Sequence, residues 1–211
     1  MSAVNITRSL TPKGNYHHGD LRTALIRAAM ELLEESGESA LSLRAVARRA
    51  GVSPAAPYRH YADREALISA IAAVGYRELA EKLAAAHPSP STPEQLASVA
   101  VAYVQFGLER SSLFRVMFAE PCDRDNDERV AATEAVSLYV GGIVERSFPQ
   151  ANAEALATAI WALVHGFAFL HLDGKLDAPT PSVVSDRITT AILALLTTVG
   201  PAPQTGTAKE V

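Results

Sequence analysis

The sequence predicts an all-α protein of about nine helices, in which an N-terminal three-helix module is joined by a long fourth helix to a C-terminal helical bundle. Apolar residues recur at intervals of three and four along most of the chain. No run of alternating β-branched residues indicates a strand, and 48% of the 211 residues are hydrophobic, enough for a sizeable core. A single Cys excludes an internal disulfide.

The first helix is expected to begin near Asp20, whose carboxylate would accept unpaired amide protons of the first turn. Gly37 is expected to end it, because glycine adopts the left-handed conformation at a helix end without steric cost. The apolar face between them carries Leu21, Leu25, Ala28, Ala29, Leu32 and Leu33. This pattern is typical of an amphipathic helix that packs on a core.

A helix-turn-helix is predicted over about residues 41–60. Ser42 would cap a short second helix, and the turn Gly51-Val52-Ser53 would follow it. Ser53 would cap the third helix, with Pro54 in its first position, where the missing amide costs nothing. The fourth helix, capped by Asp63, is expected to be longer.

The third helix, Ser53 to Tyr61, has small side chains at its start and aromatic and cationic side chains at its end. A helix in a DNA major groove needs small residues close to the bases and long donors near phosphates and guanine edges. The alternative is that Tyr58 and Tyr61 only pack against neighbouring helices. We favour packing for Tyr61 and DNA contact for Tyr58 and Arg59.

The net charge of −4 conceals an asymmetry along the chain. Residues 1–64 hold nine Lys and Arg against six acids, whereas residues 65–211 are acidic overall. Within residues 42–64, five Arg face Asp63 as the only acid. A basic module on an acidic body suits polyanion binding, although a solvated basic face would have the same composition.

From Leu21 to about Arg77 the chain resembles the TetR family of bacterial transcriptional regulators. The ordered motifs that carry the resemblance are Leu41-Ser42-Leu43-Arg44-Ala45-Val46-Ala47, then Gly51-Val52-Ser53, then Tyr58-Arg59-His60-Tyr61-Ala62-Asp63-Arg64-Glu65-Ala66-Leu67. The resemblance implies a helix-turn-helix DNA-binding domain over residues 17–77. Its DNA contacts would come from Ser42, Arg44, Ser53, Ala55, Ala56, Tyr58, Arg59, His60, Tyr61 and Arg64.

The resemblance also implies a role for each contact. Ser42 and Arg44 would touch phosphates at the start of the second helix, as would Arg64 at the start of the fourth. Ala55 and Ala56 would face base edges, Tyr58 and His60 would hold the backbone, and Arg59 would be the best candidate for a base contact.

The recognition segment departs from the family pattern. Ala55 and Ala56 stand in a region that usually holds Gly and Thr, which removes a hydroxyl contact to DNA. Pro57 stands where the family has Leu, removes an amide and pushes Ala56 away from helical angles. We therefore expect the recognition helix to begin late or to be tightly wound.

The C-terminal body is expected over residues 78–199, beyond which residues 200–211, like residues 1–16, are predicted to be disordered. A Pro-rich linker, 87–93, lies near its start. Five helices are predicted, at about 93–110, 111–120, 127–147, 152–173 and 182–199.

A pocket for a small, mostly apolar effector with one or two polar groups is expected in this body. The candidate ligand-binding residues are Tyr103, Phe106, Phe114, Met117, Phe118, Tyr139, Trp161 and His165. Trp161-x(3)-His165-Gly166 resembles a motif of one TetR subgroup, in which this domain binds effectors and dimerises. Ordinary core packing is the alternative for each aromatic residue.

Residues 155–172 are uncharged over the length of a membrane span. We reject a span, because His165 and His171 lie inside the segment and acids, Glu154 and Asp173, flank it. Together with residues 182–199 this segment would expose a large apolar patch on a monomer, so we expect a two-fold homodimer. No apolar run near the N-terminus resembles a signal peptide, and a cytoplasmic protein is expected.

No set of residues indicates catalysis, a metal or a cofactor. His165 and His171 do not share a helical face, and Cys122 lies among acids that would raise its pKa. The sequence therefore predicts a ligand-responsive repressor, not an enzyme, that a small molecule releases from a palindromic operator in double-stranded DNA. The alternatives are a protein that binds or sequesters a small molecule and an activator on the same scaffold.

Overall fold

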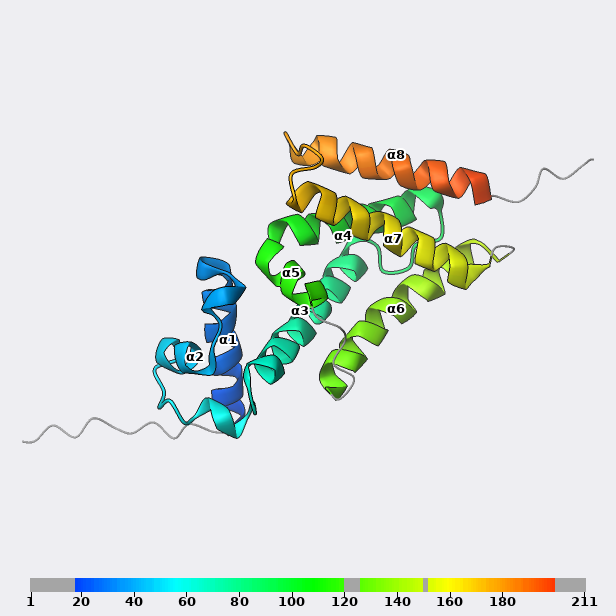
Figure 1. The fold of residues 1–211 in the computed structure, drawn as a ribbon. Helices are drawn as coiled ribbons and strands as arrows, with labels where there is room; N and C mark the ends of the chain where they lie inside the picture. Colours follow the sequence, from blue (N-terminus) through cyan, green and yellow to red (C-terminus); the bar gives the residue numbers. More distant parts are fainter. Residues whose placement is uncertain (1–17, 120–125, 150–151, 200–211) are drawn as a thin grey trace, which may run out of the picture.

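The computed structural model describes residues 18–119, 126–149 and 152–199, and it is all-α (Figure 1). The disordered ends predicted at residues 1–16 and 200–211, and the acidic loop with Cys122, lie outside the described residues. Within the described ranges the α-helices are α1 (His18–Ser36), α2 (Leu43–Arg49), α3 (Arg64–Ala86), α4 (Pro93–Glu109), α5 (Ser111–Ala119), α6 (Asp127–Ser147), α7 (Ala153–Leu172) and α8 (Pro181–Val199). Two short 3-10 helices, η1 (Glu38–Ala40) and η2 (Pro57–Arg59), lie between α1 and α3.

The N-terminal module consists of α1, α2, η2 and the start of α3. Ser42 caps α2 as predicted, since its hydroxyl accepts the Ala45 amide at 3.1 Å. Gly51 has φ of 68°, so the turn after α2 uses the conformation that glycine alone adopts without strain. The predicted capping role of Asp20 was wrong. Helix α1 already begins at His18, so Asp20 lies inside the first turn and not at the N-cap.

The predicted third helix is also shorter than expected. Of residues 53–61 only η2, Pro57–Arg59, is helical, and it is a tightly wound 3-10 turn. The Ala56 amide bonds the Ser53 carbonyl at 3.0 Å, but Pro57 has no amide to donate to an earlier carbonyl, so this first turn does not continue as a helix. The Arg59 and His60 amides then bond the Ala56 and Pro57 carbonyls. The tightly wound turn is as expected. The prediction that Pro57 would push Ala56 away from helical angles was wrong, because Ala56 has φ of −62° and ψ of −43°.

Helix α3 connects the module to the body and runs between α5 and α6 (Figure 1). Asp63 caps it, because its carboxylate accepts the Ala66 amide at 2.8 Å. The middle of α3 packs closely against α5, since a Cβ added to Gly75 would lie 2.6 Å from the Met117 sulfur. The helix is therefore fixed both to the module and to the body.

Asp63→Ala is expected to lower the free energy of unfolding by about 1 kcal/mol, because the first turn of α3 loses its cap. Asp63→Asn is the matched control, since asparagine caps a helix as well as aspartate does. Urea denaturation of both variants measures the effect. An equal loss in both variants would contradict the cap as the cause.

The body packs α4 at its centre, against α3, α7 and α8. Figure 1 shows α7 and α8 side by side across one face, with α6 along α3 on another. Phe114 on α5 is fully buried, with its ring centroid 4.8 Å from that of Phe118 and 5.7 Å from that of Tyr103. The five predicted body helices are confirmed, each to within about one residue of its bounds.

Helix α7 is, among the described helices, the one long and apolar enough to meet the length and composition criteria for a membrane span, with a mean hydropathy of 1.7. Apolar helices at the core of a helical bundle meet the same criteria. Here α7 packs against α4, α6 and α8, as expected for a bundle helix. Only 28% of its most apolar window is buried within the single chain, so much of its apolar surface lies open.

Candidate DNA-reading surface and effector cavity

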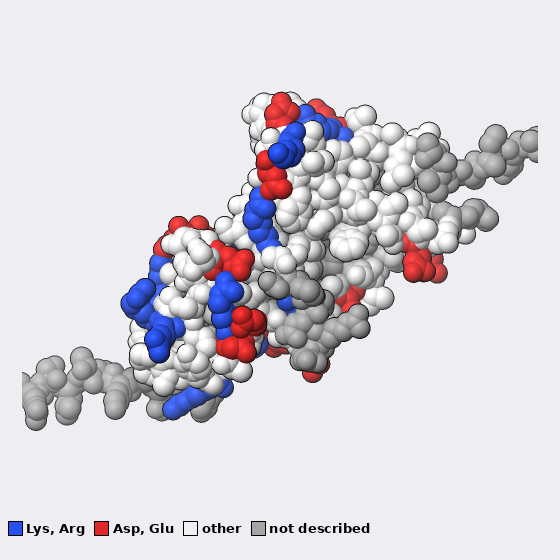
Figure 2. Space-filling view, in the orientation of Figure 1, with Lys and Arg blue, Asp and Glu red and all other residues white. Residues whose placement is uncertain are grey.

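The outer face of the N-terminal module carries three exposed arginines, Arg44, Arg48 and Arg59. Among the residues that the structure describes, none of these guanidinium groups forms an ion pair or a side-chain hydrogen bond. Tyr58 beside them is 55% exposed. Figure 2 shows basic side chains on this outer edge of the module, whereas acids gather at its other side. The guanidinium groups on this face could therefore bind a polyanion without first losing ion pairs to described residues.

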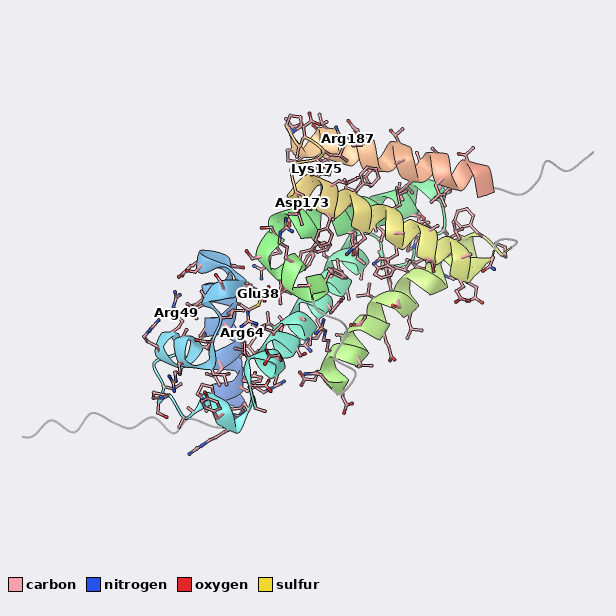
Figure 3. The ribbon with its side chains drawn as sticks, viewed as in Figure 1. Glu38, Arg49, Arg64, Asp173, Lys175 and Arg187 are labelled. Carbon is pink, nitrogen blue, oxygen red and sulfur yellow. The ribbon has the colours of Figure 1, made fainter. Side chains whose placement is uncertain are left out.

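Two other arginines of the segment are engaged within the chain (Figure 3). Arg49 pairs with Glu31 and Glu35 of α1, and this ion pair lowers the pKa of the Glu35 carboxyl. Arg64 donates to the Glu38 carboxylate at 3.0 Å and to the Leu41 carbonyl at 3.1 Å. Arg64 was expected to contact a phosphate. In this structure its guanidinium instead links the start of α3 to η1 and the residue that follows η1.

The remaining candidates differ in exposure. Ser42, Ser53 and Ala55 are exposed, whereas Ala56 and His60 are half-buried. Tyr61 is only 3% exposed and packs in the core of the module. Tyr61 as a DNA contact is therefore corrected, because burial leaves its ring no surface to present to a phosphate. Tyr61 has the packing role that the alternative interpretation gave it.

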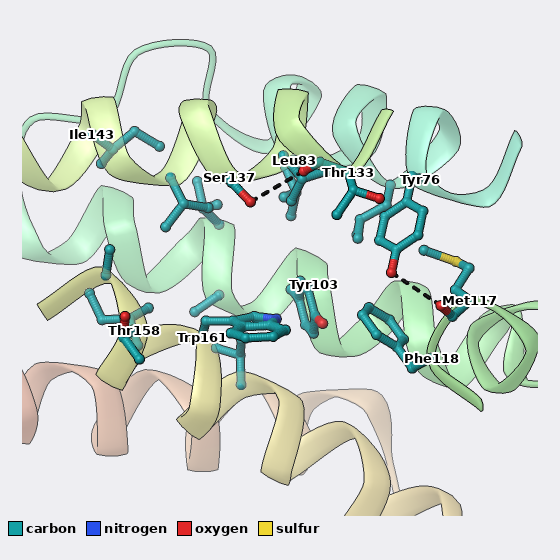
Figure 4. A pocket seen from close by; sticks show the side chains of 18 of the residues that line it. Tyr76, Leu83, Tyr103, Met117, Phe118, Thr133, Ser137, Ile143, Thr158 and Trp161 are labelled. Carbon is teal, nitrogen blue, oxygen red and sulfur yellow. Dashed lines mark hydrogen bonds between the residues drawn. The ribbon is translucent and has the colours of Figure 1, made fainter. Parts of the chain in front are cut away.

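The body contains a partly open cavity of about 400 Å³ between α3, α4, α5, α6 and α7 (Figure 4). Most of its lining is aliphatic or aromatic, and its polar groups include the hydroxyls of Tyr76, Tyr103, Thr133, Ser137 and Thr158. Its size and its mostly apolar lining are typical of small-molecule sites.

Two protein-family models match the two parts of this chain. Residues 25–71 match the model described as "Bacterial regulatory proteins, tetR family". Residues 96–196 match the one described as "Tetracyclin repressor-like, C-terminal domain". The chain belongs to the TetR family. It is accordingly a helix-turn-helix, DNA-binding transcriptional regulator and not an enzyme.

Curated relatives are described as HTH-type transcriptional regulators, and a solved structure has a similar fold. HTH-type transcriptional regulator BetI of Brucella canis is 26% identical over 164 residues, 75% of this chain and 82% of that protein. The uncharacterised HTH-type regulator YobS of Bacillus subtilis is 23% identical over 69% of this chain and 76% of its own length. A protein of unknown function from Rhodococcus sp. RHA1 has a similar structure, with a TM-score of 0.73 and 32% identity over 86% of this chain and 98% of that chain.

Half of the ligand-binding candidates of this TetR-family chain line the cavity and half do not. Those that line it are Tyr103, Met117, Phe118 and Trp161. Those outside the lining are Phe106, Phe114, Tyr139 and His165. Phe106 and Phe114 pack in the core, and the Tyr139 hydroxyl donates to the Leu83 carbonyl at 3.2 Å.

His165 lies behind the cavity wall. Its Nδ1 is 3.1 Å from the Tyr103 hydroxyl, and the rings of Phe118 and Phe169 lie 4.5 and 4.8 Å from its own, centroid to centroid. It therefore orients Tyr103 within the wall. Burial lowers the pKa of His165, because the apolar rings disfavour the imidazolium.

This shift predicts acid sensitivity. As the pH falls below about 6.5, the unfolded chain takes up a proton at His165 before the folded chain does, so the folded state loses stability. The melting temperature should fall more between pH 7.5 and 5.5 in the wild type than in His165→Gln. Equal slopes would contradict the assignment, since the other histidines contribute to both proteins alike.

Several polar residues of the cavity lining and one exposed arginine were not among the predicted site residues. Arg129, Thr133 and Ser137 recur every four residues and form one cavity-facing side of α6. That spacing, together with Val136 and Val140 in the lining, was the signal available in the sequence. Arg48, four residues after Arg44, shares the exposed face of α2 as that spacing predicts, although it was not among the predicted DNA contacts.

Proposed function

We propose that this protein is a homodimeric repressor that binds a palindromic operator and is released by a small, mostly apolar molecule in the cytoplasm. The observation that carries the proposal is that one helix serves both sites. Helix α3 begins in the DNA-reading module at Arg64 and lines the cavity with Tyr76, Leu79 and Leu83. A ligand that prefers one orientation of α3 would shift the population of DNA-competent dimers.

In the DNA complex, Arg44 and Arg48 would neutralise phosphates, and Tyr58 would hold the backbone. Ser42 and Ser53 lie at the exposed start of α2 and of the recognition segment, where a hydroxyl reaches a phosphate. Arg59 would enter the major groove and read a guanine edge, while Ala55 allows close approach to the bases. His60 and Ala56, both half-buried, would contribute at the edge of this surface.

The homodimer would form through α7 and α8. Ala155, Ala159 and Ala162 are exposed along α7, and a Cβ added at Gly166 meets no atom within 4 Å. Figure 2 shows the body over these helices as mostly uncharged, with charges gathered at the end where α7 turns into α8. A two-fold contact would cover this apolar face and hold two recognition segments about 34–36 Å apart.

We further propose membership of the TetR subgroup with a Trp-x(3)-His-Gly motif. Trp161 is 50% exposed and also lines the cavity, His165 supports the cavity wall, and Gly166 lies on the open face. The motif would thus join the effector cavity to the dimer contact within six residues of α7.

Footprinting of the DNA upstream of the protein's own gene tests the proposal. A protected inverted repeat that is lost on adding a cavity ligand would support it. A ligand-induced thermal shift without any protected DNA would favour a sequestering protein instead. Protection accompanied by higher transcription from the same promoter would show an activator.

A further inference from the structure

We propose that Arg22 and Glu128 form a positioning pair, which sets the orientation of the N-terminal module on the body and thereby the spacing of half-sites that the dimer accepts. Neither residue was among the predicted DNA contacts. The proposal rests on the proposed function in one respect, because it requires two modules held on one two-fold operator. It adds two residues that determine which operators fit by acting through the orientation of the module.

Two sets of ion pairs join α1 of the N-terminal module to the body, one near each end of the helix. Near its start, Arg22 donates to the Glu128 carboxylate of α6 at 2.7 Å. Near its end, Glu34 pairs with Arg110, which lies between α4 and α5 and also pairs with Glu78 of α3 at 3.2 Å. Twelve residues of helix separate the two sets by about 18 Å. Together they can therefore fix the direction of α1 as well as its distance from the body.

Glu128 is held in place by its position in the first turn of α6. Asn126 caps that turn, because its side chain accepts the Arg129 amide at 3.0 Å. A helix N-terminus also favours a carboxylate. The hydrogen bond from Arg22 lowers the pKa of the Glu128 carboxyl, and the charge of Arg77 on α3 acts in the same direction. The acceptor of the pair is therefore fixed to the body and ionised at neutral pH.

The pair also lies beside the end of the recognition segment. Burial raises the pKa of Tyr61, whereas the nearby charge of Arg22 lowers it, so the Tyr61 hydroxyl lies close to the pair. The Tyr61 amide bonds the Pro57 carbonyl at 3.0 Å, which ties this residue to the turn η2. A movement of Arg22 relative to Glu128 would therefore be felt in the recognition segment as well as in α1.

A single pair of this kind contributes little to folding. Its side chains are 43% and 46% exposed, and exposed pairs change an equilibrium by at most about 5-fold. Operator spacing engages the pairs of both protomers. One base pair added between the half-sites moves them apart by about 3.4 Å and rotates them by about 35°. Both modules must then turn on their bodies, which strains both pairs, whereas the correct spacing leaves both intact.

Operators selected from random DNA by the wild-type protein supply the probe. Each is remade with one base pair added between its half-sites, and fluorescence anisotropy gives the ratio of affinities for the original and the altered operator. Glu128→Gln should lower this ratio at least about 3-fold, because the module turns more easily without the pair. The change also removes a negative charge, but that effect alone would strengthen binding to both operators alike and leave the ratio unchanged.

Two comparisons separate the pair from its individual charges. Arg22→Gln should lower the ratio as much as Glu128→Gln does, and the double variant should lower it no further, because all three lack the same contact. Glu134→Gln makes the same charge change at another exposed position of α6 and should leave the ratio unchanged.

Three results would overturn the proposal and leave DNA binding intact. These are an unchanged ratio in Glu128→Gln, an equal fall in Glu134→Gln, or effects of the two single changes that add in the double variant. Selected operators without an inverted repeat would instead contradict the two-fold operator of the proposed function, and the spacing role with it.

Discussion

Replacing Gly166 by Arg should convert the protein to a monomer and lower its operator affinity by about 10²–10⁴-fold. Gly166 lies on the open face of α7, where nothing within 4 Å would meet an added Cβ. The fold of the single chain should therefore tolerate the change. A charged side chain in an apolar two-fold contact is opposed by its own copy in the partner, so the contact should fail. Each monomer would then bind one half-site without the benefit of the second.

Sedimentation equilibrium and operator titration by fluorescence anisotropy measure the two effects. Ala131→Arg is the matched control, because Ala131 is an exposed alanine on α6, outside the proposed contact. It should leave both the mass and the affinity unchanged. A Gly166→Arg protein that remains dimeric and binds its operator normally would remove α7 from the dimer contact.

Replacing Arg59 by Ala should cost about 1–3 kcal/mol of operator binding, roughly 5–150-fold in affinity, and relax the preference at one base pair of each half-site. The reason is that Arg59 is exposed, on a turn rather than in the core, and is engaged with no described acid. A bidentate contact to guanine is the strongest single base contact that the segment can supply.

Arg44→Ala should act differently from Arg59→Ala. Loss of a phosphate contact weakens binding to all sequences alike and lowers the salt slope by about one. Arg146→Ala, far from the module, is the control for net charge. If Arg59→Ala behaves like Arg44→Ala, with no change in sequence preference, Arg59 contacts the backbone and not a base.

The helices and their order were predictable because their signals are local. Ser42 and Asp63 act as caps in the structure as the sequence suggested, and Gly51 adopts the left-handed conformation at the predicted turn. The tight winding at Pro57 was predictable for the same reason, since the missing amide belongs to that residue alone. The start of α1 was predicted less well, because Asp20 fits the first turn of a helix as well as it fits the cap.

The details of both sites depend on contacts between distant segments. Whether an arginine of residues 42–64 is available depends on α1 and η1: Arg49 meets Glu31 and Glu35, and Arg64 meets Glu38, while Arg59 meets none of them. The cavity depends on how α6 packs against α3 and α7. This packing directs Val140 into the cavity, whereas the Tyr139 hydroxyl bonds the Leu83 carbonyl outside the lining. The residue types of the ligand-binding candidates alone therefore could not distinguish those that line the cavity from those that do not.

The central claim is that residues 42–64 read DNA as a unit, and amide hydrogen exchange with and without operator tests it most directly. Much of the segment between α2 and α3 is outside helical hydrogen bonding, so its amides should exchange rapidly in the free protein. Operator binding should slow exchange across residues 42–64, with a smaller change in α7 and α8. Unchanged exchange in that segment, with protection appearing elsewhere on the chain, would contradict the account.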